Sequence, residues 1–257
     1  MSIYEHFRPE EAVFVDKVLE WKQMAEEYHQ VKLTDFLDPR QQQIVATIIG
    51  NQGDAILKFY GVAPKAERKR ALIYPNYLDL NEEEFQIEVL EIDYPSKFYS
   101  LEHRQILGSF MSLGLTREKC GDILLQENRA QIVVAKEVAS YIEMNLQSIG
   151  KMKVSLSSVQ ADRILRLQEE WKEQSGTVSS LRLDVVIAEM LHLSRQKVQP
   201  LIKNGLVKVN WKTVEQTAYE CFPGDVFSIR GYGRSKLFSV EGKTKRDKWR
   251  VLYGILK

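Results

Sequence analysis

Several residue types that mark secreted, membrane-bound or metal-binding proteins are scarce in this sequence. It contains two cysteines, Cys120 and Cys221, far apart in the chain, and four histidines, none with another His or Cys at the spacing of metal ligands. No apolar run approaches the ~20 residues that a membrane helix needs, and residues 1–9 carry charges and no apolar signal segment. These absences predict reduced thiols, no disulfide framework, no metal site, no membrane contact and a cytoplasmic location.

The chain also lacks the motifs through which many enzymes hold their cofactors. It has no Gly-x-Gly-x-x-Gly for a dinucleotide or methyl donor and no Gly-x-x-x-x-Gly-Lys for a nucleotide. Paired carboxylates such as Glu26-Glu27 fit an ordinary helix surface, and neither cysteine has a partnered histidine. We therefore expect no catalytic residue and no cofactor, and predict that the protein is not an enzyme.

Charge is distributed unevenly along the chain. Residues 181–257 hold 15 Lys and Arg against 7 Asp and Glu, whereas residues 1–180 hold 21 against 28, although the net charge of the whole is only +1. Chance clustering on a solvated surface is the simpler explanation of such an imbalance. A difference of 15 charges between the two parts nevertheless favours a polyanion as the partner of the C-terminal third.

We expect an α+β chain whose first domain, residues 1–66, is small and mostly helical. Apolar residues spaced among charges predict a first helix around residues 13–21. A second helix should begin at Asp38-Pro39, because aspartate is a good N-cap and proline suits the first helical position. Turn residues follow Gly50, where this helix should end.

Residues 67–158 predict a ferredoxin-like middle domain with the order β-α-β-β-α-β from Phe85 onward. This order also builds the common RNA-recognition domain, which stacks bases on aromatic residues of its central strands. The two strands expected there, residues 121–125 and 131–135, contain no aromatic residue, so the stacking platform is missing. The expected elements are strands at 71–77, 85–94, 122–125, 131–135 and 153–156, and helices around 106–111 and 136–147.

A polar connector, residues 159–180, leads to the basic domain at 181–257. Apolar residues at i, i+4, i+7 and i+8 from Leu183 predict one helix, and Ser194 is a good N-cap for the next. Arg195 lies in the first turn of that second helix, as does Lys197, where the positive end of the helix dipole disfavours cations. This local cost makes sense if a phosphate docks there.

Five short segments of this basic domain, spread over about 50 residues, carry a family resemblance. They are Arg182-Leu183-Asp184, Ser194-Arg195, Ile202-Lys203-Asn204-Gly205, Val207-Lys208-Val209-Asn210 and Gly224-Asp225. In order and spacing they resemble the S-four RNA-binding domain, in which two helices pack on a small twisted sheet and RNA is recognised by its shape and phosphates. The resemblance implies that Asp184 is structural, orienting or pairing with nearby basic residues. It implies an RNA face made of Arg182, Ser194, Arg195, Lys197, Lys203, Lys208 and Asn210.

The tail narrows the resemblance. Arg230-Gly231-Tyr232-Gly233-Arg234, followed by Lys236, is similar to the bacterial YlmH/RqcP family, and so is the three-domain layout. Two guanidinium groups around an aromatic turn suit phosphates and a stacked base, although a plain turn with surface arginines fits equally when the motif is taken alone. Within a basic domain we favour RNA contact by Arg230, Arg234 and Lys236.

The resemblance implies a cytosolic factor of ribosome-associated quality control. Such a factor binds large ribosomal subunits that still hold peptidyl-tRNA, and supports a partner that tails the stalled nascent chain with alanine. Its expected partners are structured RNA, namely large-subunit ribosomal RNA and tRNA, the large subunit itself and the tailing factor. Two other hypotheses remain: a different regulator that binds ribosomal or messenger RNA, and an RNA-modifying enzyme with an unrecognised site.

Overall fold

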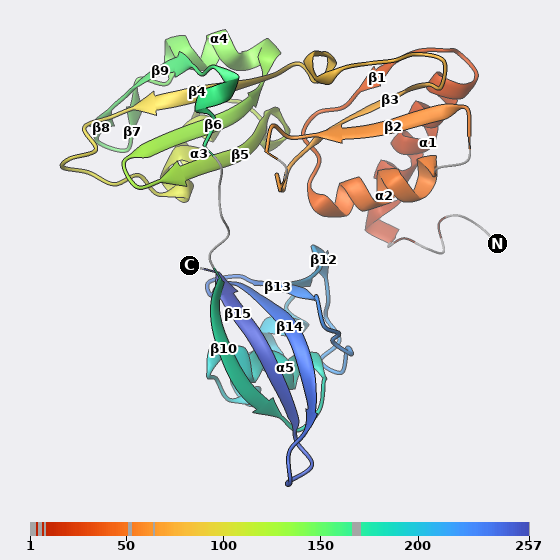
Figure 1. The fold of residues 1–257 in the computed structure, drawn as a ribbon, viewed down its shortest axis with the longest axis vertical. Helices are drawn as coiled ribbons and strands as arrows, with labels where there is room; N and C mark the ends of the chain where they lie inside the picture. Colours follow the sequence, from red (N-terminus) through yellow and green to blue (C-terminus); the bar gives the residue numbers. More distant parts are fainter. Residues whose placement is uncertain are drawn as a thin grey trace. The chain divides into compact units, whose positions relative to one another are not determined.

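Two compact units make up the computed structural model, Met1–Leu167 and Gln168–Lys257 (Figure 1). Each unit buries its own apolar side chains, and helices and strands occur in both, which confirms the expected α+β class. Among the described residues, no helix is long and apolar enough to cross a membrane. The structure describes residues 4, 7, 9–50, 53–63, 65–165 and 171–256.

The first domain packs two helices against a small antiparallel sheet. Helices α1 (Ala12–Glu26) and α2 (Pro39–Ile49) share a buried apolar cluster with the strands. The described strands pair in the order β1 (Lys32–Leu33), β3 (Arg70–Pro75) and β2 (Ala55–Tyr60). The first domain is therefore an α+β domain, with two helices on a sheet, rather than the mostly helical domain expected from the sequence.

The start of α2 is as predicted. The Asp38 carboxylate accepts a hydrogen bond from the Gln41 backbone N–H at 2.8 Å, and the Gln41 side chain accepts from the Asp38 N–H at 2.9 Å. This reciprocal capping box, with Pro39 as the first helical residue, satisfies backbone donors that would otherwise lack partners. Gly50 ends the helix with a φ of 69°, a left-handed value that glycine adopts readily.

Strand β3 corrects the expected domain boundary at residues 66 and 67. We predicted a strand at 71–77 within the middle domain, but β3 pairs with β1 through Leu72↔Leu33 and with β2 through Leu57↔Ile73. All residues of β3 are buried, as expected of a central strand covered on both faces. Periodicity shows that such a run is a buried strand but not which strands flank it.

The middle domain has the predicted β-α-β-β-α-β order. Its antiparallel sheet has the strand order β5-β6-β4-β9, so the first strand lies between the third and the fourth. A short hairpin, β7 (Ser148–Ile149) and β8 (Met152–Lys153), precedes the last strand. The six main elements are β4 (Ile87–Asp93), α3 (His103–Ser112), β5 (Cys120–Gln126), β6 (Arg129–Ala135), α4 (Lys136–Asn145) and β9 (Ser155–Ser158). Single 3-10 turns lie at Pro9–Glu11, Glu82–Phe85, Arg117–Lys119 and Ala161–Arg163.

Both faces of the middle sheet are covered by the chain itself. Helices α3 and α4 cover one face, and Phe36 of the first domain packs with Leu165 against the opposite face. The buried amide of Gln131 fixes the segment around Leu165: its oxygen accepts from the Leu165 N–H at 2.9 Å, and its NH₂ donates to the Arg163 carbonyl at 3.0 Å. The first part of the expected connector therefore packs on the sheet, over the face where related RNA domains stack bases.

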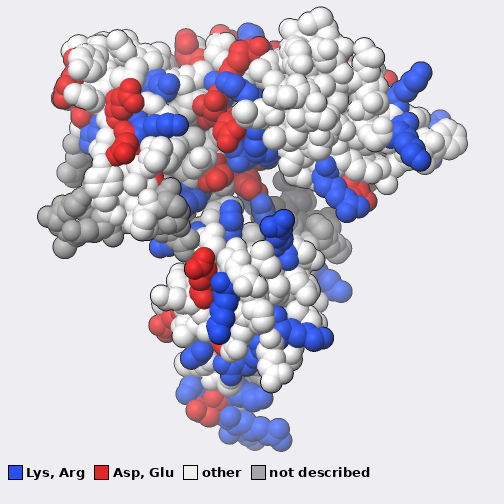
Figure 2. All heavy atoms as spheres, turned by 180° about the vertical axis from the view of Figure 1, so that it is seen from behind, with Lys and Arg blue, Asp and Glu red and all other residues white. Residues whose placement is uncertain are grey.

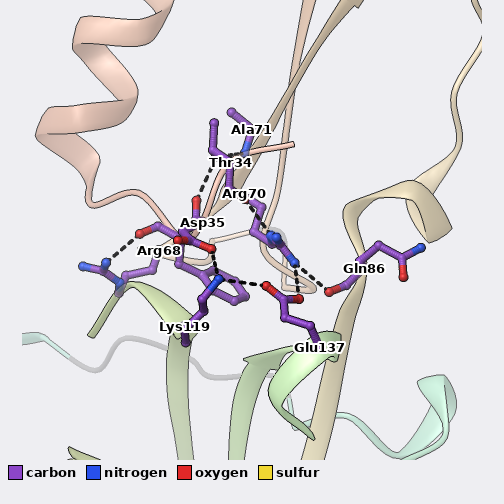
Figure 3. A network of polar contacts seen from close by, with 9 residues as sticks. Thr34, Asp35, Arg68, Arg70, Ala71, Gln86, Lys119 and Glu137 are labelled. Atoms are coloured by element: carbon purple, nitrogen blue, oxygen red, sulfur yellow. Dashed lines mark hydrogen bonds and ion pairs between the residues drawn. The ribbon is translucent and has the colours of Figure 1, made fainter. Parts of the chain in front are cut away.

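A polar network joins the first and middle domains (Figure 3). The buried guanidinium of Arg70 donates to the carbonyl oxygens of Thr34 at 2.7 Å and Gln86 at 2.9 Å, and lies 3.3 Å from the Glu137 carboxylate. The Lys119 ammonium bridges the carboxylates of Asp35, at 2.6 Å, and Glu137, at 3.0 Å. Because these bonds run between elements of both domains, they hold the two as one unit.

The C-terminal unit packs α5 (Leu183–Leu191) and α6 (Arg195–Lys203) on one face of a sheet. Its first strand lies where the sequence predicted the rest of the connector, and pairs along its whole length with the last strand, from Trp171↔Leu256 to Val178↔Trp249. In sheet order, the described strands are β10 (Trp171–Val178), β15 (Trp249–Leu256), β14 (Gly233–Lys243), β13 (Val226–Ile229), β11 (Val207–Val209) and β12 (Lys212–Thr213).

Candidate nucleic-acid interface

A buried carboxylate organises the region where α5 and α6 meet. Asp184 is fully buried in the first turn of α5 and accepts hydrogen bonds from Arg195 at 2.7 and 3.3 Å, from Gln199 at 3.0 Å and from Arg182 at 3.3 Å. Burial opposes ionisation of this carboxyl, but the hydrogen bonds from Arg195, Gln199 and Arg182 outweigh it and lower the pKa of Asp184. The structural role expected for Asp184 is thus confirmed.

The two arginines are anchored at one side and open to solvent at the other. The side chain of Arg182 is 44% exposed and that of Arg195 is 51% exposed, although both pair with the same carboxylate. A guanidinium carries five N–H donors, and these contacts use only one donor of Arg182 and two of Arg195. The remaining donors are available to an anion, and the three ionised groups together carry one positive charge.

The start of α6 is exposed and basic, as the sequence predicted. Ser194 occupies the N-cap position with an extended backbone, and its hydroxyl makes no capping bond to any described residue. Ser194, Arg195 and Lys197 are all exposed. The first turn of α6 therefore presents backbone donors, a free hydroxyl and two cations together, an arrangement suited to a phosphate.

Most of the other predicted residues lie on the sheet and in its turns. Lys208 on β11 is paired in register with Ser228 of β13, which is paired with Arg234 of β14. Since Val207 and Val209 point into the core beneath the helices, this row occupies the opposite face of the sheet. Lys236 shares that face, Arg230 lies in the turn between β13 and β14, and Lys203 is exposed at the end of α6. The predicted residues therefore lie partly on the two helices and partly on the sheet, and their contact with RNA stays a prediction.

Asn210 has a structural role in this fold. Its side-chain oxygen accepts from the Val226 N–H at 2.9 Å, and its NH₂ group donates to Asp225 at 2.7 Å. The backbones of Asn210 and Trp211 both have positive φ, 47° and 64°, in the turn between β11 and β12. Its assignment to the RNA face stays a prediction, because both polar groups of the amide already have partners inside the domain.

The turn from β13 to β14 presents its aromatic residue outward. Gly231 and Gly233 have φ values of 88° and 89°, which only glycine adopts without strain. Between them Tyr232 is 48% exposed, and Arg230 is exposed beside it. The predicted aromatic turn with neighbouring cations is therefore formed, and its contact with RNA stays a prediction.

Sequence reasoning missed one group of basic residues, in the loop that joins β14 to β15. Its signal was present, because five Lys and Arg stand with one Asp in residues 243–250. The two cysteine thiols, in contrast, are free and buried. Burial raises the pKa of Cys120 to about 11 and also raises the pKa of Cys221. No group of His, Cys, Asp and Glu in the described part of the chain could hold a metal ion.

The comparisons first define the class of protein. The family model of the S4 domain matches residues 181–227, and models described as "Putative RNA-binding domain in YlmH" and "YlmH, N-terminal" match residues 81–163 and 10–78. The chain is thus an RNA-binding protein whose S4 domain follows two further domains. The matched segments agree with the structure in assigning the first sheet, including β3, to the N-terminal domain.

Whole-chain similarity then identifies the family. The chain is 46% identical over 252 residues to "Ribosome-associated protein quality control protein P2" of Bacillus subtilis (strain 168), covering 98% of both chains. It is also similar to the solved "Cell division protein ylmH from Streptococcus pneumoniae", at 32% identity with a TM-score of 0.54, covering 64% of this chain and 100% of that one. The chain belongs to the YlmH family, as the sequence resemblance indicated.

One further relative has a different description. An "Uncharacterized RNA pseudouridine synthase" of Aquifex aeolicus (strain VF5) is 37% identical over 51 residues, which is 20% of this chain and 21% of that protein. The similarity leaves most of each protein unmatched.

Proposed function

We propose that this protein is a cytoplasmic RNA-binding factor of ribosome-associated quality control. It binds large ribosomal subunits that carry peptidyl-tRNA, through ribosomal RNA and tRNA, and supports alanine tailing of the stalled chain by a separate tailing factor. The similarity to the Bacillus subtilis quality-control protein over 98% of both chains supports this role. The observation that carries it is the cluster in which Asp184 orients two half-exposed arginines beside the basic first turn of α6.

The geometry favours recognition of phosphates over chemistry on RNA. Guanidinium groups held by a buried carboxylate cannot swing freely, so less conformational entropy is lost when they bind an anion. The lysines at positions 197, 203 and 208 are exposed and add positive charge to the same unit. An RNA-modifying enzyme is the second candidate, and only the short match to a pseudouridine synthase favours it.

Co-sedimentation with isolated large subunits tests the proposal. The triple variant Lys197→Gln, Lys203→Gln, Lys208→Gln removes three exposed charges. If all three lysines contact phosphates, the slope of log affinity against log salt concentration should become shallower by about 2 to 3 units. The matched control Lys17→Gln, Lys58→Gln, Lys65→Gln removes three exposed lysines from the N-terminal domain, outside the segment that matches the putative RNA-binding domain, and should bind as wild type.

Two further measurements separate the candidate functions. A strain that lacks this protein should accumulate stalled chains with fewer alanine additions, as read by mass spectrometry of a stalling reporter. Wild-type alanine tails in that strain would contradict the proposed role. Loss of a specific base modification from its ribosomal RNA would instead support the enzyme.

A further inference from the structure

The loop between β14 and β15 is the most basic segment of the C-terminal unit. Residues 243–250, which are this loop together with the strand residues at its two ends, contain five Lys and Arg and a single Asp. In Figure 2, blue side chains gather at the lower end of this unit, which corresponds to the β14–β15 end in Figure 1. The match to the S4 family model ends at residue 227, so this loop lies outside the part of the chain that the model describes.

The loop has a defined conformation. Its ends are closed by a hydrogen bond from the Thr244 N–H to the Lys248 carbonyl at 2.7 Å, and the Asp247 N–H donates to the Thr244 carbonyl at 3.0 Å. The Lys243 ammonium lies 2.7 Å from the Asp247 carboxylate and 5.1 Å from the centre of the Trp249 ring. Asp247, the only acid in residues 243–250, is therefore paired with Lys243, which also packs on the indole of Trp249.

Four cations remain without an acidic partner. Lys245, Arg246, Lys248 and Arg250 are exposed, and none forms an ion pair with any residue that the structure describes. Charged side chains, lysine especially, also protect sheet edges from aggregation, and the experiment below separates that role from RNA binding. Concentrating one sign at the end of a hairpin adds self-repulsion, which an anionic partner would relieve.

The loop and the aromatic turn lie at opposite ends of one strand. The turn that carries Arg230 and Tyr232 precedes Gly233, the first residue of β14, and the basic loop follows its last residue, Lys243. A strand of this length spans roughly 30 Å, at about 3.3 Å per residue. The two basic groups are therefore too far apart for one phosphate, but they suit separate points along a folded polynucleotide.

We propose that Lys245, Arg246, Lys248 and Arg250 form a second phosphate-binding surface that holds the backbone of structured RNA. This surface acts at a point roughly 30 Å along β14 from the aromatic turn. The inference rests on the proposed function that this unit binds RNA, and it adds a contact that the S4 resemblance does not include. An ordered loop that already pairs its own acid presents these cations at little entropic cost.

The test is the affinity of full-length protein for isolated large ribosomal subunits at several salt concentrations. The variant Lys245→Gln, Arg246→Gln, Lys248→Gln leaves the Lys243–Asp247 pair intact. We expect roughly tenfold weaker binding, and a salt slope shallower by about 2 to 3 units. The charge-preserving variant Lys245→Arg, Arg246→Lys, Lys248→Arg should bind as wild type, and so should Lys17→Gln, Lys58→Gln, Lys65→Gln. Unchanged tryptophan fluorescence and melting would show that the variants fold.

The outcomes separate this inference from its premise. If wild-type protein does not bind large subunits, the proposed function fails, and the inference fails with it. If wild type binds and the loop variant matches it in both affinity and salt slope, the inference alone is refuted. A loop variant that keeps its RNA affinity but self-associates would likewise refute it, because the charges would then protect the part of β14 that β13 does not pair, beyond Lys236.

Discussion

Replacing Asp184 by asparagine tests whether the buried carboxylate positions the two arginines. The change keeps the shape of the side chain but removes the charge that accepts hydrogen bonds from Arg182, Arg195 and Gln199. A hydrogen bond to a charged group contributes about 1.5–3 kcal/mol. Solvent screens the half-exposed arginines, and the amide oxygen can still accept one bond, so we expect a loss of about 1–3 kcal/mol in unfolding free energy.

The effect should depend on pH in a defined direction. The hydrogen bonds lower the pKa of Asp184 in the folded protein relative to an ordinary aspartate. Its contribution to stability is therefore fully present above the unfolded-state pKa of about 3.9, and is lost as the pH falls through the lower folded-state pKa. The difference in stability between wild type and Asp184→Asn should be constant near neutral pH and shrink only below about pH 4.

Thermal unfolding followed by tryptophan fluorescence measures this difference, because Trp171, Trp211 and Trp249 all lie in the C-terminal unit. A loss of 1 kcal/mol lowers the melting temperature of a domain of this size by about 4–8 °C. The variant Glu173→Gln removes an exposed carboxylate from the same unit and should melt as wild type.

The RNA affinity of Asp184→Asn shows whether Asp184 acts by positioning the two arginines or only through the net charge of the unit. Removing an acid from a basic unit should strengthen RNA binding if only net charge matters. If Asp184 holds the arginines in a binding geometry, Asp184→Asn should instead weaken binding roughly tenfold, equivalent to about 1.4 kcal/mol. A variant that melts as wild type at pH 7 and binds RNA more tightly would refute this reasoning.

Two other predictions concern the N-terminal unit and the thiols. Arg70→Met leaves two carbonyl oxygens and a carboxylate without their buried donor, and should destabilise the N-terminal unit by about 2–4 kcal/mol in calorimetry. Arg104, whose side chain is 84% exposed, provides the control: Arg104→Met should change the unfolding transition of the N-terminal unit little. Equal effects of Arg70→Met and Arg104→Met would contradict the stabilising role of the polar network between the first and middle domains. Cys120 and Cys221 are buried with raised pKa values, so a thiol reagent at pH 8 should label them only after denaturation, and rapid labelling of native protein would disprove this.

Short-range signals in the sequence determined much of the fold. The start of α2 follows from Asp38-Pro39, because a cap involves residues only three positions apart. Leu183 begins α5 and Ser194 precedes α6 as expected, and Gly205, which follows α6, has a left-handed φ of 68° that suits glycine. The order of elements in the middle domain was also predicted, since each element has its own period of apolar residues.

Tertiary structure decided which of these elements are neighbours. Strand β10 looked like polar connector because its strand partners lie at the other end of the unit's sequence, in β15. Phe36 and Leu165 gave no local sign that they cover the middle sheet. Arg182 and Arg195 were placed on an RNA face, but their shared bonds to Asp184 are known only from the packing of α5 against α6. Capping and periodicity are set within a few residues of chain, whereas strand pairing, burial and shared ion pairs depend on residues that only folding brings together.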